Sequence, residues 1–127
     1  MTRTKKQARS LTRIGASPVH GRGMFATTAI RRGTVLEKGH VLPFDDKQAR
    51  DAQIIDLYAF DFDGKGRCLV LGSASLCNHS NTPNVEVEID ETRSTYRLVA
   101  VRGIKRGEEL FVDYGDAYWD SVSGFAH

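Results

Sequence analysis

The sequence predicts a mainly β domain built from short strands with one small helix. Apolar and polar residues alternate with a period of two, as in half-buried strands, and glycine and proline interrupt the chain throughout. Val85, Val87 and Ile89 alternate with acidic residues, which indicates a strand with one exposed face. A polar turn at 91–95 then leads to a second strand at 96–102.

The middle of the chain carries a second pair of expected strands and the expected helix. Aromatic residues at positions 58, 60 and 62 alternate with Ala59 and Asp61, and a glycine-containing turn at 63–66 precedes a strand at 68–71. The helix is predicted at 47–57, where Asp45 or Asp46 can cap the first turn and alanine and leucine fall near one face.

A short internal repeat predicts two similar corners. Residues 30–36 and 104–110 each place an isoleucine before a basic pair and a glycine, after which the chain returns to a strand. Because glycine adopts positive φ without steric cost, we expect Gly33 and Gly107 to turn the chain there.

Length and composition indicate one domain of ordinary globular character. The chain has 127 residues, of which 40% are hydrophobic and 27% charged. Residues 1–14 are basic and are predicted to form a flexible tail, residues 15–119 the folded domain, and residues 120–127 a C-terminal tail. Two cysteines cannot supply a structural zinc site unaided, so no metal is expected.

Charge and hydropathy limit the partners. The net charge of +2 argues against a nucleic-acid clamp, although the basic tail would bind nucleic acid weakly. No apolar run approaches the ~20 residues of a membrane span, and the N-terminus lacks the apolar core of a secretory signal. We therefore expect an intracellular protein, cytoplasmic or nuclear, with delivery into a host cell as an alternative.

Three segments are candidates for chemistry, although each has an ordinary interpretation. They are G-R-G at 21–23, N-H-S-N-T-P-N at 78–84 and G-E-E-L-F-V-D-Y-G at 107–115. The first suits a tight turn, the second a polar turn, and Tyr114 a strand-end residue with a paired hydroxyl. Together, in the same order and with similar spacing, they resemble the G-x-G, N-H-S-x-x-P-N and G-E-E-L-x-x-D-Y-G motifs of SET domains.

This resemblance implies a SET-domain (β-clip) fold with a threaded C-terminal segment, and a protein-lysine N-methyltransferase that uses S-adenosyl-L-methionine. Tyr114 would be the catalytic residue beside the reacting methyl group. The implied cofactor-binding residues are Arg22, Gly23, Met24, Asn78, His79 and Trp119. The implied walls of the substrate channel are Tyr58, Val112 and Tyr114. No cysteine-rich segment follows the D-Y-G motif, so Trp119 or Tyr118 is expected to cover the adenine; equally, Trp119 could anchor the C-terminus.

The implied chemistry is a direct displacement, in which a neutral lysine amine attacks a methyl carbon activated by sulfonium. Alignment of donor, methyl and acceptor would supply most of the catalysis, so Tyr114 is expected to orient the reactants more than to act as a base. Many relatives carry an aromatic residue where this chain has Val112, which predicts space for more than one methyl group.

The expected partner is a protein or peptide lysine, in a histone tail or another basic protein, with Glu86, Glu88, Asp90 and Glu91 as part of an acidic rim. A homodimer is expected by analogy with the smallest SET proteins. The alternative function is a SET or β-clip module that binds peptide without transferring methyl. Residues 3–10 also look like a core-histone amino terminus; chance explains this, or Lys5 or Lys6 is methylated by the protein itself.

Overall fold

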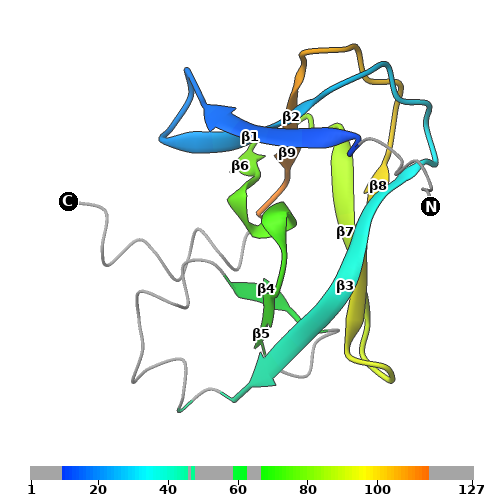
Figure 1. Cartoon of the computed structure of the whole chain (residues 1–127). Helices are drawn as coiled ribbons and strands as arrows, with labels where there is room; N and C mark the ends of the chain where they lie inside the picture. The colour runs from blue at the N-terminus through cyan, green and yellow to red at the C-terminus, as the bar shows by residue number, and fades with distance from the viewer. Residues whose placement is uncertain (1–9, 46, 48–58, 63–66, 115–127) are drawn as a thin grey trace, which may run out of the picture.

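Two β-sheets make up the computed structural model, which describes residues 10–45, 47, 59–62 and 67–114 (Figure 1). One sheet has the strand order β1-β2-β9-β6 and the other β4-β5-β3-β8-β7. The strands are β1 Thr12–Ala16, β2 Arg22–Ala26, β3 Val35–Phe44, β4 Ala59–Asp61, β5 Arg67–Val70, β6 Asn78–His79, β7 Val85–Asp90, β8 Thr95–Ala100 and β9 Glu109–Val112, and a 3-10 helix, η1, spans Ser73–Leu76. The mainly β fold class is confirmed.

Several predictions fall on residues outside this description. They concern the turn at 63–66, the helix at 47–57 apart from Lys47, the residues Tyr58 and Trp119, and the tails at 1–9 and 120–127. Within the described ranges, no helix combines the length and the apolar character needed to cross a membrane.

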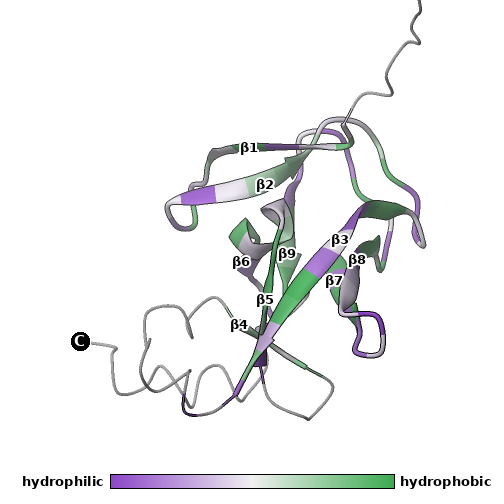
Figure 2. Ribbon diagram, turned by 60° about the horizontal axis from the view of Figure 1, so that its bottom comes forward, coloured by the Kyte–Doolittle hydropathy of each residue, from purple (hydrophilic) through white to green (hydrophobic). Residues whose placement is uncertain are grey.

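The predicted strand pairs are present. Strands β7 and β8 pair antiparallel from Val85↔Ala100 to Asp90↔Thr95, and Figure 2 shows hydrophilic residues at the turn between them. The second strand ends at Ala100, two residues earlier than predicted. Strand β4 lies within the aromatic alternation, and β5, predicted at 68–71, spans Arg67–Val70 and pairs antiparallel with it.

The predicted boundary of the N-terminal tail is wrong at its C-terminal end. Residues 12–14 belong to β1, which pairs antiparallel with β2 from Thr12↔Ala26 to Ala16↔Arg22. The Arg13 guanidinium lies 4.7 Å from the centroid of the Phe25 ring, a cation–π contact. Basic residues alone suggested a solvated tail, whereas backbone pairing and this stacking place the segment in the domain.

The two repeated corners meet in space. Ile30 and Ile104 form an antiparallel bridge, in which each N–H donates to the other's carbonyl at 2.8 Å. Gly33 has φ of 89° and Gly107 has φ of 84°, so both glycines adopt the predicted positive φ.

Each corner is hydrogen-bonded to the end of the strand that precedes the other corner. The Gly33 N–H donates to the Ala100 carbonyl, and the Gly107 N–H donates to the Ala26 carbonyl, both at 2.8 Å. The pair of corners therefore fastens β2 and β8, which lie in different sheets, to the same junction.

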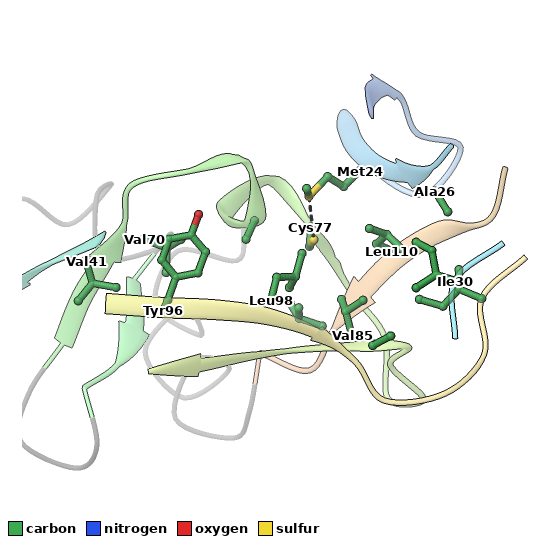
Figure 3. Packing of buried hydrophobic residues seen from close by; sticks show 14 of the residues in the cluster. Met24, Ala26, Ile30, Val41, Val70, Cys77, Val85, Tyr96, Leu98 and Leu110 are labelled. Carbon is green, nitrogen blue, oxygen red and sulfur yellow. Dashed lines mark hydrogen bonds between the residues drawn. The ribbon is translucent and has the colours of Figure 1, made fainter. Parts of the chain in front are cut away.

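The core lies between the sheets and takes side chains from both. Met24, Leu98 and Leu110 are fully buried, and Figure 3 shows them gathered in one cluster with Cys77. Burial of each large apolar side chain contributes about 1.5–3 kcal/mol before entropy is counted.

A buried tyrosine anchors η1 to the larger sheet. The Tyr96 hydroxyl donates to the Glu37 carboxylate at 2.5 Å, and the Ala74 N–H of η1 donates to the same oxygen at 2.9 Å. Burial, followed by this bond to an anion, raises the pKa of Tyr96 above its ordinary value. Gly72 precedes η1 in extended conformation, and a Cβ there would overlap the Tyr96 hydroxyl. Space, and not φ, therefore requires glycine at this position.

We expect Gly72→Ala to lower the free energy of unfolding by about 1–3 kcal/mol, because the added methyl displaces the Tyr96–Glu37 pair. Gly103→Ala is the matched control, since a Cβ there meets no atom within 4 Å. Urea unfolding of both variants measures the difference, and equal effects would contradict the packing argument.

Candidate active site

The three sequence motifs meet on neighbouring strands of the smaller sheet. Strand β9 lies between β2 and β6, antiparallel to β2 through Met24↔Leu110 and parallel to β6 through Asn78↔Phe111 and His79↔Val112 (Figure 1). Parts of the chain that are distant in sequence are thereby placed side by side.

Asn78 is 6% exposed and presents one unused acceptor. Its Nδ2 amide donates to the His20 carbonyl at 3.0 Å, to the Arg22 carbonyl at 3.3 Å and to Glu109 Oε2 at 2.9 Å. No described residue donates to its Oδ1. A buried acceptor without a protein donor suits a ligand that brings an N–H, such as an ammonium group.

Gly23 allows the close approach at this point. A Cβ on Gly23 would overlap the Glu109 carboxylate and lie 3.2 Å from Asn78 Nδ2. Its neighbours differ in exposure: Arg22 is exposed, while the Met24 side chain is fully buried, with its sulfur 3.5 Å from the Cys77 thiol. A ligand that contacts Gly23 would therefore do so through the backbone.

His79 is held in one tautomer by two hydrogen bonds. The Tyr114 backbone N–H donates to Nδ1 at 3.0 Å, so the neutral ring carries its proton on Nε2, which donates to Asn81 Oδ1 at 2.9 Å. The Asp113 carboxylate lies 3.7 Å from Nδ1. The imidazole therefore fixes the backbone at the D-Y-G motif.

The Tyr114 hydroxyl donates to the Cys77 carbonyl at 3.0 Å. Its ring centroid lies 5.2 Å from that of His79, with the planes inclined at 49°. The side chain is held at both its backbone and its hydroxyl. This geometry suits an orienting residue.

Val112 is buried in the hydrophobic cluster, opposite His79 in the ladder. Tyr58 and Trp119 lie outside the described residues. The other predicted site residues lie on, or directly after, the neighbouring strands β2, β6 and β9.

Sequence reasoning missed Glu109 and Ser17. Glu109 is 8% exposed, and both of its carboxylate oxygens accept from the Ser17 hydroxyl at 2.9 Å. The adjacent pair of glutamates in the G-E-E-L motif was the available signal. Nothing in the local pattern states which of the two is buried.

Asn84, at the end of the N-H-S-N-T-P-N segment, is fully buried and structural. Its amide donates to the Glu109 carbonyl, and its Oδ1 accepts from the Phe111 N–H, both at 2.8 Å. The side chain thereby holds β9 against the loop that follows β6.

Burial raises the pKa of the Cys77 thiol to about 12, with further contributions from the Glu37 and Glu109 carboxylates. The thiol is therefore neutral at physiological pH and is not a nucleophile.

The fold and the site define a class of protein: a β-sheet domain in which a glycine turn, an Asn-His strand and an Asp-Tyr strand end converge. Residues 21–115 match the family described as "SET domain", and the chain belongs to the SET-domain family.

Curated relatives carry the names of lysine methyltransferases. A fission-yeast "Histone-lysine N-methyltransferase, H3 lysine-37 specific" is 32% identical over 78% of this chain and 69% of its own length. The zebrafish "N-lysine methyltransferase KMT5A-A" is 30% identical over 80% of this chain, which spans 34% of that protein. Human "Histone-lysine N-methyltransferase 2B" is 31% identical over 87% of this chain, which spans 4% of that protein. The predicted enzyme class, protein-lysine N-methyltransferase, is confirmed at the level of the family.

A solved structure shares the fold. The crystal structure of a Plasmodium falciparum protein, provisionally described as a histone methyltransferase, aligns with a TM-score of 0.73 and 23% identity. The alignment covers 88% of this chain and 99% of that one. The predicted SET fold is confirmed.

The Cys77 environment predicts a loss of stability in alkali. The unfolded thiol ionises near the ordinary cysteine pKa of 9.0, whereas the folded thiol keeps its proton until about 12. Above pH 9 the unfolded state therefore binds fewer protons, and the free energy of unfolding falls by up to about 1.4 kcal/mol per pH unit from this group. Urea unfolding between pH 8 and 10.5 should show a steeper decline for the wild type than for Cys77→Ala. Parallel declines would show that the thiol is not the cause.

Proposed function

We propose that this chain transfers a methyl group from S-adenosyl-L-methionine to the side-chain amine of a protein lysine. The observation that carries the proposal is the unpartnered, buried Asn78 Oδ1 on the strand beside Tyr114, no donor to it being found among the described residues. The family and the names of its relatives support it.

The residues present fit the proposed cofactor. When bound, S-adenosylmethionine supplies a methyl carbon made electrophilic by the attached sulfonium. Asn78 Oδ1 would accept from its ammonium group, and the backbone of Arg22, Gly23 and Met24 would hold its methionine part. His79 would lie toward the adenine, with Trp119 as its apolar cover.

Tyr114 would align the substrate amine. Its hydroxyl is held in place by the bond that it donates to the Cys77 carbonyl, and a hydroxyl oxygen that donates one bond can also accept one, as from an incoming amine. Tyr58 and Val112 would line the channel and exclude water, which keeps the amine and methyl carbon in line.

The proposed substrate is a lysine in a histone tail or another basic protein, as the names of the relatives suggest. Acidic residues of β7 would attract a basic peptide, but two of them are already paired: Glu88 with Arg97 and Asp90 with Arg93. Glu86 is exposed on the same strand. A histone substrate, as in the names of the relatives, would place the protein in an intracellular setting, cytoplasmic or nuclear. We extend the proposal to a homodimer.

The alternative is a SET module that binds a peptide without methyl transfer. The intact set of Asn78, His79 and Tyr114, with its hydrogen bonds in place, favours the enzyme.

Methyl transfer from labelled cofactor to a histone mixture and to a total lysate tests the activity. We expect Tyr114→Phe to lower kcat by about 100-fold, because alignment is lost, and Asn78→Ala to raise KM for the cofactor. Arg93→Ala, on the exposed β7–β8 turn, is the surface control and should retain full activity. Wild-type rates in both site variants would refute the assignment, and peptide binding without any transfer would establish the alternative.

Val112 predicts the degree of methylation. Because valine is smaller than the aromatic residue of many relatives, di- or trimethyllysine should accumulate at long reaction times. Mass spectrometry of the product distinguishes the states, and strictly monomethylated lysine would contradict this role for Val112.

A further inference from the structure

We propose that Glu109 is a positioning residue that orients the Asn78 amide toward a ligand ammonium group and supplies its counter-charge. The inference rests on the proposed function, because it concerns recognition of the amino-acid part of the cofactor. Glu109 would favour the binding of ligands that carry an α-ammonium group over nucleoside ligands that lack one.

The first observation is an uncompensated buried carboxylate. Glu109 is 8% exposed, and among the described residues its partners are the neutral Ser17 hydroxyl and Asn78 amide, with no ion pair. Burying a carboxylate without a cation is costly, so such a group generally has a charged partner. The ligand is the available source of that positive charge.

The second observation is the direction of the Asn78 amide. Glu109 Oε2 and the carbonyls of His20 and Arg22 all surround Nδ2, which is the donor end. A reversed amide would set Oδ1 against three oxygen atoms, so the oxygen must point the other way. The carboxylate is the one charged member of this set and forms the shortest of the three bonds, at 2.9 Å.

The third observation links Glu109 to the loop before β2. The Ser17 hydroxyl donates to the carboxylate and accepts from the N–H groups of Val19 at 3.0 Å and His20 at 3.3 Å. The same carboxylate therefore holds the Asn78 amide and the loop whose carbonyls face it.

These contacts polarise the Asn78 side-chain amide. The carboxylate draws on the N–H end of the Asn78 amide and so increases the negative charge on Oδ1. A cation that donates to Oδ1 then gains both a stronger hydrogen bond and the field of the carboxylate. A ligand without an ammonium group gains neither.

Binding calorimetry on the full chain tests the inference with three probes. S-adenosylmethionine and S-adenosylhomocysteine carry the ammonium group, whereas methylthioadenosine keeps the nucleoside and lacks the amino-acid part. For Glu109→Gln we expect Kd to rise about tenfold or more for the first two probes, and to change less than about twofold for methylthioadenosine.

Glu108→Gln is the matched control. It makes the same substitution on the neighbouring residue, whose carboxylate pairs with Arg102 at 3.2 Å, and it should leave all three dissociation constants unchanged. Thermal unfolding of both variants accompanies the titrations, so that binding is compared between folded proteins.

The outcomes separate this inference from the proposed function. Equal weakening of all three probes by Glu109→Gln would show a general structural role, and unchanged binding of S-adenosylmethionine would show no role; either result overturns the inference alone. A wild-type protein that binds none of the probes overturns the proposed function, and this inference with it.

Discussion

The placement of β9 between β2 and β6 is the constraint on which the site depends. One neighbour supplies the glycine turn and the other supplies Asn78 and His79, so the register of a four-residue strand sets the distances among all three motifs. Asn84 reinforces this register from the side by bonding the backbone of Glu109 and Phe111. The site is thus built mainly from backbone pairing, and its side chains are fixed by where that pairing places them.

Two carboxylates, the half-buried Glu37 and the buried Glu109, differ in their partners. Glu37 is matched to a tyrosine hydroxyl and an η1 amide, and it serves to hold η1 against β3 and β8. Glu109 faces neutral donors only, among the described residues, at the junction of three strands. Burial first, and then both carboxylates, raise the pKa of the Cys77 thiol, which consequently remains neutral and contributes packing. The interior therefore has a negative potential close to the place where a cationic cofactor is proposed to bind.

Local patterns in the sequence were sufficient for the strand alternation of β7, for the two corner glycines and for the three motifs. Each of these depends on residues within a few positions of one another. Non-local pairing was not accessible in the same way. Thr12–Ile14 follow directly on a basic and polar segment, and their pairing with β2 shows that they are β-structure. Glu108 and Glu109 are chemically identical, and the buried one is decided by Asn78 and Ser17, which lie 31 and 92 residues away. The His79 tautomer likewise depends on an amide 35 residues distant.

The central position of β9 also has a consequence for the order in which the protein can form. Within the described part of the chain, β9 is the strand that pairs with β6 and with one edge of β2, so neither pairing forms until the ribosome has made most of the domain. Until then the growing chain exposes unpaired backbone groups beside the apolar residues Met24 and Phe25, the combination that promotes association between chains. The bridge between Ile30 and Ile104 likewise cannot form until Ile104 has been synthesised. The proposed cofactor site therefore assembles late in folding, and a chain whose synthesis has not reached β9 would lack that site.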